Sequence, residues 1–189
     1  MRNAKLILLG ATAALAACGG NAPTAQNGAA SGAPVNNAVA PPATGTAIAV
    51  LTTADGQPAG TARVTQADGA LRVSVEAQAL PPGEHGVHIH MTGKCDAPEF
   101  TSAGGHWNPD SKHHGLDNPE GQHAGDMPNL TIGADGKGAL DYELKGGTLA
   151  GLFDDDGSAF VVHAGQDDQK SDPAGNSGAR IACGVFRTG

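Results

Sequence analysis

The sequence predicts an all-β domain in which about eight short antiparallel strands form a sandwich or barrel. Aromatic residues make up only 3% of the 189-residue chain and 29 residues are glycine, which favours short strands and many turns over a helical bundle. Beyond the N-terminal segment, no long run carries apolar residues at helical spacing. Segments rich in β-branched residues instead alternate with turn signals such as Asp55-Gly56 and Asp135-Gly136.

Each expected strand follows from a local pattern. Residues 71–76 alternate apolar and polar side chains, which is the period of a half-buried strand. In residues 86–90, Val87 and Ile89 are expected to face one way and His88 and His90 the other. The expected strands span residues 46–52, 61–66, 71–76, 86–90, 130–132, 139–144, 159–163 and 180–186.

Two long loops interrupt the strands, at residues 91–128 and 164–178. Both are rich in Gly and Asp and lack strand patterns over most of their length. Loops of this length inside a compact domain are usually functional or disordered. We therefore expect two long functional loops on a β-scaffold.

Residues 1–18 have the features of a lipoprotein signal peptide. Arg2 and Lys5 precede a short apolar run, too short to span a membrane as a helix. The segment ends in Leu15-Ala16-Ala17-Cys18, which resembles a bacterial lipobox and predicts lipidation of Cys18. A plain signal peptide with an Ala-x-Ala cleavage site is the alternative. Gly19 and Gly20 lack the aspartate associated with inner-membrane retention, so we expect a periplasmic protein anchored to the outer membrane.

Residues 19–44 are expected to be a flexible tether, because Ala, Gly, Asn, Pro, Ser and Thr dominate and no charge occurs. The folded domain is then residues 45–189. Removal of residues 1–18 takes away two bases and no acid, so the formal charge falls from −8 to −10. This charge argues against nucleic-acid binding, which requires a basic face, and the lipid anchor is the one expected membrane contact.

Histidines are concentrated in one stretch of the chain. Six of the eight lie within residues 88–126: His88, His90, His106, His113, His114 and His123. Imidazole is the commonest protein ligand of zinc and copper, so the stretch predicts a metal site, with a solvated polar loop as the alternative. Alternate residues of a strand point the same way, so His88 and His90 can reach one ion.

The cysteines indicate an oxidising compartment. Cys18 belongs to the lipobox, which leaves Cys95 and Cys183 as an even pair in an exported protein. A disulfide is the default for such a pair. It would stabilise the fold by roughly 4–5 kcal/mol in the chain-entropy model.

Six motifs together resemble copper/zinc superoxide dismutase, most closely the bacterial exported branch of lipoprotein type. The resemblance covers about residues 46–189 and implies an eight-stranded, immunoglobulin-like Greek-key sandwich or barrel with one copper and one zinc per subunit. The motifs are residues 86–90 (GVHIH), 104–109 (GGHWNP), 114–115 (HG), 123–126 (HAGD), 161–163 (VVH) and 178–184 (GARIACG).

By this resemblance, His106 bridges the two metals. The implied copper ligands are His88, His90, His106 and His163. The implied zinc ligands are His106, His114, His123 and Asp126. The family places its ligand just before a glycine, which favours His114 over His113, so we interpret His113 as a solvated loop residue. His85 lies outside every motif and is interpreted as structural or surface.

The resemblance also implies residues beside the metals. Asp167 resembles a carboxylate that hydrogen-bonds one copper ligand and one zinc ligand, and Asp168 is its rival. Arg180 matches an arginine that docks superoxide, since a planar, permanent cation suits a small anion. The implied reaction converts superoxide to dioxygen and hydrogen peroxide, with His106 as the proton carrier.

The main alternative is a non-catalytic periplasmic domain that binds copper or zinc, which would have no use for Arg180. A copper-only relative is a second alternative, disfavoured by the intact zinc set. Met91 departs from the family pattern, because a charged or polar residue is frequent after the second histidine. The sequence leaves open a homodimer and which of Lys94, Lys112 and Lys170 attracts the substrate.

Overall fold

The computed structural model describes residues 45–189. The predicted signal peptide of residues 1–18, the expected tether of residues 19–44 and the predicted lipidation of Cys18 lie outside the described residues. Within the described part, no helix is long and apolar enough to cross a membrane. The strands there are β1 (Gly45–Thr53), β2 (Pro58–Ala67), β3 (Ala70–Ala77), β4 (Gly83–His85), β5 (Val87–His90), β6 (Leu130–Ile132), β7 (Gly138–Glu143), β8 (Ala159–His163), β9 (Arg180–Val185) and β10 (Arg187–Thr188), with 3-10 helices η1 (Thr101–Ala103) and η2 (Ala150–Phe153).

The all-β expectation is confirmed, and all eight expected strands are present. Two short strands were not expected. β4 pairs with β6. β10 pairs with β1 through two residues. Neither is long enough to show a periodic pattern, and both exist because a partner strand lies beside them.

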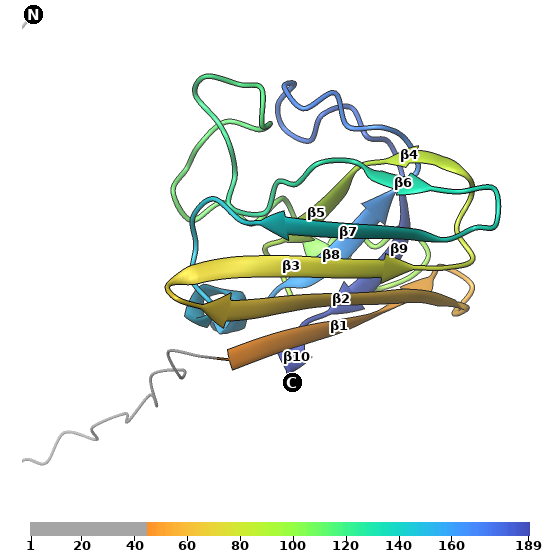
Figure 1. The fold of residues 1–189 in the computed structure, drawn as a ribbon, viewed down its shortest axis with the longest axis horizontal. Helices are drawn as coiled ribbons and strands as arrows, with labels where there is room; N and C mark the ends of the chain where they lie inside the picture. Colours follow the sequence, from red (N-terminus) through yellow and green to blue (C-terminus); the bar gives the residue numbers. More distant parts are fainter. Residues whose placement is uncertain (1–44) are drawn as a thin grey trace, which may run out of the picture. The chain divides into compact units, whose positions relative to one another are not determined.

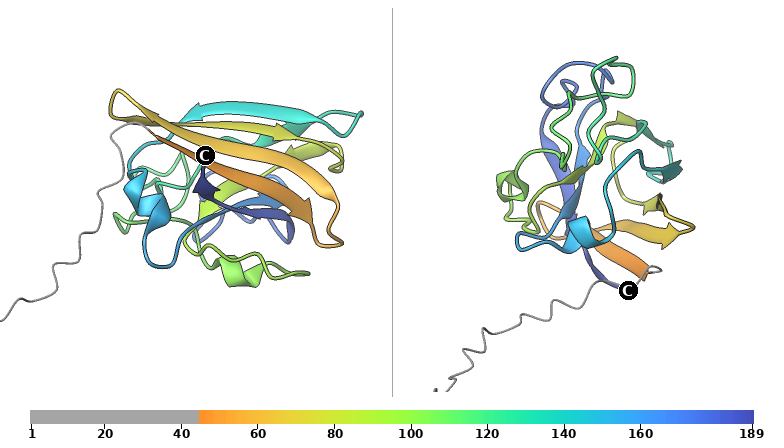
Figure 2. Two further views of the ribbon diagram at one scale, coloured as in Figure 1. Left: turned by 90° about the horizontal axis from the view of Figure 1, so that it is seen from below. Right: turned by 90° about the vertical axis from the view of Figure 1, so that its left-hand side faces the viewer.

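The main sheet is antiparallel and follows the order β5-β8-β9-β1-β2-β3-β7. Strands β1, β2 and β3 form a meander, whereas β9 returns from the end of the chain to pair with β1. This return is the Greek-key connection. Figure 1 shows the curl of the sheet, with β8 and β9 crossing behind β3 and β7, and Figure 2 shows it from two further sides.

The core lies between the two parts of the curled sheet. In β3 the apolar residues Leu71, Val73 and Val75 are buried, while the intervening Arg72 is exposed. β8 is buried on both faces. Its Phe160 and Val162 belong to the main core, and its Ala159 and Val161 pack in a second cluster with Phe100 and Cys183.

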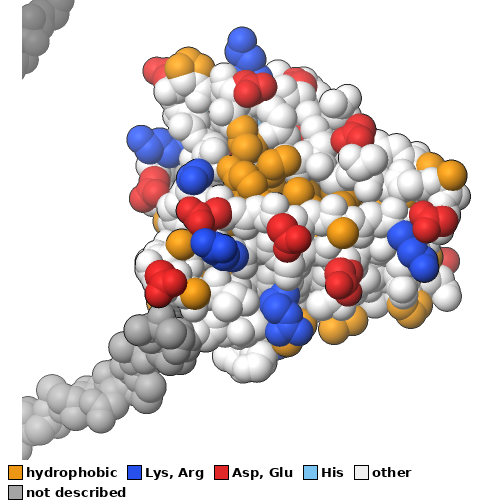
Figure 3. Space-filling model, in the orientation of Figure 1, with side chains coloured by type: hydrophobic (Ala, Val, Ile, Leu, Met, Phe, Trp, Pro, Cys, Tyr) orange, Lys and Arg blue, Asp and Glu red, His pale blue; other side chains and the backbone are white. Residues whose placement is uncertain are grey.

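The two long loops lie side by side at one end of the sheet (Figure 1). The backbone N–H of Asp117 donates to the carbonyl of Gln169 (3.0 Å), and Asn118 Nδ2 donates to the carbonyl of Lys170 (3.3 Å). Gly115 is required at this contact, because its φ is +104° and a Cβ there would lie 2.1 Å from the Gln169 oxygen. On the face drawn in Figure 3, acidic and basic side chains are interspersed without a basic patch.

Candidate metal centre

Strands β5 and β8 bring three of the expected copper ligands together. They pair antiparallel, with His88 opposite Val161 and His90 opposite Ala159. His163 ends β8, and His106 of the first long loop forms an isolated bridge with His90. We call these four residues, His88, His90, His106 and His163, the copper-side cluster. They are buried, and each offers one nitrogen such that all four lie within 4.8 Å of one another.

The copper-side cluster contains two nitrogens that no hydrogen bond satisfies. Among the described residues, His88 Nδ1 and His106 Nε2 are buried without a partner. His90 Nε2 and His163 Nε2 lie 3.4 Å apart. A buried polar atom without a partner is costly and calls for an explanation. A copper ion held by four imidazoles would satisfy all four nitrogens at once, so the residues fit copper.

The expected zinc ligands converge on one carboxylate oxygen. We call His106, His114, His123 and Asp126 the zinc-side cluster. Asp126 Oδ1 lies 2.9, 3.1 and 3.2 Å from Nδ1 of His106, His114 and His123 respectively, and the Nδ1 atoms of His106 and His123 are 3.4 Å apart. A tetrahedral zinc with Zn–N bonds of about 2.0–2.1 Å keeps its donors about 3.3 Å apart. The residues therefore fit zinc.

His88 also lies close to the zinc-side cluster, since a compact group of donors includes it with His106, His114 and Asp126. Its ring stacks on His106 with centroids 3.9 Å apart. However, its Nε2 donates to Asp167 Oδ2 at 2.6 Å, which leaves Nδ1 for the copper side. His123 Nδ1 contacts Asp126 and His106 directly, so we retain His123 as the fourth zinc-side donor.

The two ring nitrogens of His106 face different clusters. Its Nδ1 faces Asp126, and its Nε2 is the unpartnered atom on the copper side. Gly125 makes this placement possible, because its N–H donates to the carbonyl of Trp107 and its carbonyl accepts from Ile89 of β5. A Cβ on Gly125 would lie 2.3 Å from the Ile89 carbonyl oxygen. The loop is thus pressed against β5.

In His90 and His163, the ring nitrogen that is not offered to the copper-side cluster is hydrogen-bonded to a backbone carbonyl. His90 Nδ1 donates to the Gly104 carbonyl (2.9 Å) and His163 Nδ1 to the Gly178 carbonyl (3.2 Å). These bonds set the tautomer and leave each Nε2 with a free lone pair. Such orientation is needed before an ion can bind without rearrangement.

Asp167, and not Asp168, joins the two clusters. Its carboxylate accepts from His88 Nε2 at 2.6 Å and from His114 Nε2 at 3.0 Å. Asp168 instead accepts from the backbone N–H groups of Lys170 and Ser171 within its own loop. A substitution of Asp167 would therefore remove a hydrogen bond from one ligand of each cluster.

Burial and charge keep the copper-side imidazoles neutral. Burial lowers the pKa of His88 to about 3 and that of His163 to about 4. It also lowers the pKa of His90 and His106. A neutral imidazole retains the lone pair that a metal requires.

The zinc-side carboxylate stays ionised. Burial would raise the pKa of Asp126, but hydrogen bonds from His106, His114 and His123 outweigh it and hold the pKa far below its ordinary value. Burial likewise opposes ionisation of Asp167, and its bonds with His114 and His88 again lower its pKa. For His114, burial lowers the pKa, but the bonds to Asp126 and Asp167 raise it to about 9. The proton that this raised pKa keeps on His114 offsets part of the carboxylate charge, and a bound divalent cation would replace that proton.

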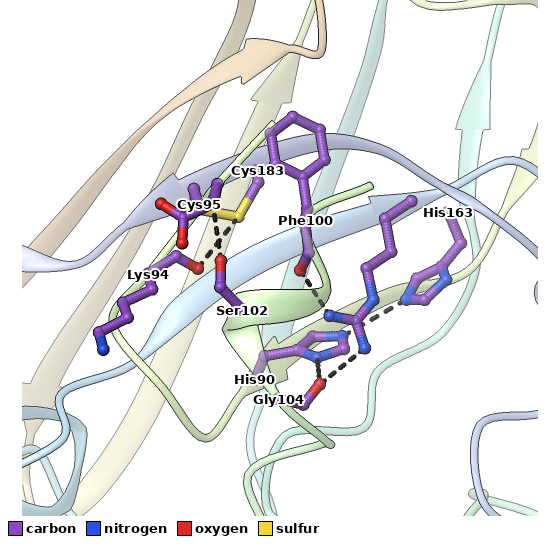
Figure 4. The surroundings of a disulfide bond; sticks show 10 residues. His90, Lys94, Cys95, Phe100, Ser102, Gly104, His163 and Cys183 are labelled. Atoms are coloured by element: carbon purple, nitrogen blue, oxygen red, sulfur yellow. Dashed lines mark hydrogen bonds between the residues drawn. A yellow bond between two sulfur atoms is a disulfide. The ribbon is translucent and has the colours of Figure 1, made fainter. Parts of the chain in front are cut away.

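Arg180 is held beside the copper-side cluster by the loop that the disulfide ties down. Its two terminal nitrogens donate to the carbonyls of Phe100 and Gly104, each at 2.6 Å. Gly104 is also the acceptor for His90, and Figure 4 shows His90, His163, Phe100 and Gly104 around this point. The Cys95–Cys183 disulfide is present, with Cα atoms 5.8 Å apart. Arg180 has further N–H donors for an anion.

Three residues near the site were not identified from the sequence. Asn129 clamps the backbone of Asp167, donating to its carbonyl (2.9 Å) and accepting from its N–H (2.8 Å). The N–H of Gln169 donates to Asp167 Oδ1 (2.7 Å). Asp172 accepts from the N–H of His114 (2.7 Å). Asn129 and Asp172 carry no local signal because their partners lie 38 and 58 residues away in the chain. Gln169 lies two residues from Asp167, but it contributes only its backbone N–H, which no side-chain pattern marks.

The two remaining histidines lie outside both clusters. His113 has a half-exposed side chain and contacts Asp172, as expected for a solvated loop residue. His85 is buried, and its ring nitrogens lie 2.8 Å from the carbonyl oxygens of His163 and Pro81. Of the two readings offered by the sequence, structural or surface, His85 is structural.

Comparison with known proteins identifies relatives across most of the chain. A family model described as copper/zinc superoxide dismutase matches residues 58–186. The chain is 50% identical over 140 residues to superoxide dismutase [Cu-Zn] 1 of Aquifex aeolicus, spanning 70% of this chain and 82% of that protein. It is 42% identical over 148 residues to superoxide dismutase [Cu-Zn] of Caulobacter vibrioides, spanning 75% and 85% respectively.

Solved structures agree with these matches. A Cu/Zn superoxide dismutase from Brucella abortus superposes with a TM-score of 0.61 at 32% identity, covering 75% of this chain and 99% of that one. A superoxide dismutase-like protein from Bacillus subtilis gives a TM-score of 0.67 at 43% identity, covering 73% and 96%. Both similarities extend over the β-scaffold described above.

Proposed function

The chain belongs to the copper/zinc superoxide dismutase family and is a superoxide dismutase; we propose that it acts in the cell envelope with a copper and a zinc that share His106. The observation that carries this proposal is the His106 ring. Its Nδ1 belongs to a four-donor group suited to zinc, and its Nε2 is a buried, unpartnered atom in a four-imidazole group suited to copper.

Three side chains at the site have distinct parts in converting superoxide to dioxygen and hydrogen peroxide. When bound, copper supplies the exchange of single electrons with superoxide, and zinc is structural. Arg180 binds the monoanion through its charge and its N–H donors. His106 Nε2 holds and releases a proton, while its Nδ1 stays fixed on the zinc side. Asp167 keeps the rings of His88 and His114 in orientation.

The presence of Arg180 favours an enzyme over a metal-storage protein. A guanidinium has no lone pair and cannot bind the metals, so a store would have no use for it. This distinction matters because some relatives are named only superoxide dismutase-like.

Arg180→Ile should leave copper and zinc content unchanged and reduce kcat/KM for superoxide by roughly tenfold or more, since tenfold corresponds to about 1.4 kcal/mol of transition-state stabilisation. Arg180→Lys should fall between, because it keeps the charge and loses the planar fork. Stopped-flow dismutation and metal analysis on the same samples provide the measurement. Equal rates for wild type and Arg180→Ile at equal copper loading would support the metal-store alternative.

The location is supported by the sequence of residues 1–44. The lipobox ending at Cys18 and the uncharged tether suit a periplasmic domain anchored to the outer membrane. Cys18→Ser should release the protein from the membrane fraction into the soluble periplasm. A wild-type protein that is already soluble, with its mature N-terminus elsewhere, would contradict the anchor.

A further inference from the structure

Met91 is an exposed methionine next to the copper-side cluster. It directly follows His90 and is 49% exposed. Its N–H donates to the Gly105 carbonyl at 2.9 Å. Its sulfur lies against Gly104 and Gly105, 3.8 and 3.9 Å from the points where a Cβ on each glycine would stand. The thioether thus covers a short backbone segment while remaining open to solvent.

The same backbone segment organises the site. The Gly104 carbonyl accepts from both Arg180 (2.6 Å) and His90 (2.9 Å). Gly105 immediately precedes His106. The Met91 side chain and the Arg180 guanidinium thus both lie against the same residue, Gly104.

We propose that Met91 is a modification site, at which the hydrogen peroxide produced by the enzyme oxidises the thioether to the sulfoxide. In this step the sulfur attacks one peroxide oxygen, the O–O bond breaks, and an S–O bond forms. The second oxygen leaves as water with both protons, so sulfur is oxidised by two electrons and peroxide is reduced by two. The proposal rests on the proposed function, which supplies the peroxide.

Two properties make Met91 the methionine expected to be oxidised: its side chain is exposed to solvent, and it follows the copper-side residue His90. Sulfoxide formation depends on access of the oxidant to the thioether. The chain contains three methionines, and Met1 lies in the expected signal peptide. Met127 is fully buried in the main core, although it follows the zinc-side Asp126. Met127 therefore serves as an internal control of the same chemistry without exposure.

Trypsin separates the two methionines. Cleavage after Arg72 and Lys94 places Met91 in one peptide, and cleavage after Lys112 and Lys137 places Met127 in another. The gain of one oxygen on each peptide can then be quantified by mass spectrometry. The metal-loaded domain would be exposed either to a superoxide flux, with dismutation recorded, or to an equal total amount of added hydrogen peroxide.

The expected result in both arms is a Met91 sulfoxide fraction at least about ten times that of Met127. Met91→Leu, which keeps an apolar side chain of similar size, should show no added oxygen on the same peptide. Met91 oxidised no faster than Met127 by added peroxide would overturn the proposal. It would also be overturned if Met91 stayed unmodified during measured dismutation. Absence of dismutation would count against the proposed function, and the added-peroxide arm would still decide the Met91 site.

Discussion

The two metal clusters share His106 but are built in different ways. The copper-side cluster takes three of its four histidines from β5 and β8, whose pairing places them in one patch. The zinc-side cluster takes all its residues from the loop between β5 and β6, where no strand fixes their spacing. Strand alternation alone brings His88 and His90 onto one face. The zinc side depends on long-range hydrogen bonds.

Asp126 holds the zinc side together. Its Oδ1 contacts three imidazoles, and its Oδ2 accepts from the N–H groups of Gly115 (2.9 Å) and His123 (3.0 Å). One carboxylate therefore organises both the donors and the backbone of the loop. The comparison teaches that the copper side should tolerate the loss of one contact better than the zinc side.

The largest expected effect is that of Asp126→Asn. The amide keeps the shape but loses the charge that the three imidazoles and the zinc require, so zinc should be absent and the free energy of unfolding should fall by roughly 3–5 kcal/mol. Hydrogen exchange should rise across residues 104–128 and remain slow in β8. Asp141→Asn, at an exposed position of β7, is the matched control. Retention of zinc, or equal loss of protection in β8, would contradict the comparison.

Removal of the disulfide should have a comparable or smaller effect. Cys183→Ser should lower the free energy of unfolding by roughly 2–5 kcal/mol, as measured by denaturant titration. It should also lower kcat/KM, because the disulfide ties down the loop whose Phe100 and Gly104 carbonyls hold Arg180. Cys95→Ser should match it. Two free thiols in the native wild-type domain would refute the pairing.

Asp167→Asn tests the connection between the clusters and should have the smallest effect on the fold. Loss of a carboxylate that orients ligands typically costs about 10–100-fold in metal affinity. Both copper and zinc should be affected, since Asp167 contacts His88 and His114. Competition with chelators gives the two affinities. Asp168→Asn is the control and should change neither. A loss confined to one metal would show that the clusters are held independently.

Several features of this protein were determined by the sequence itself. Alternation in residues 71–76 and the apolar run of residues 159–163 predicted strands that are present as β3 and β8. The His-x-His spacing predicted two imidazoles on one strand face, and the even cysteine count predicted the disulfide that is present. These signals are local or depend only on composition, so they can be recognised without knowledge of the fold.

Other features were decided only by tertiary structure. Asp167 and Asp168 are chemically identical neighbours, and only the packing of one long loop against the other directs Asp167 to the ligands. The clamp by Asn129 and the burial of His85 are likewise invisible locally. β4 is a strand only because β6 lies beside it. Each depends on contacts between residues far apart in the chain, and a periodic pattern along the sequence carries no information about such contacts.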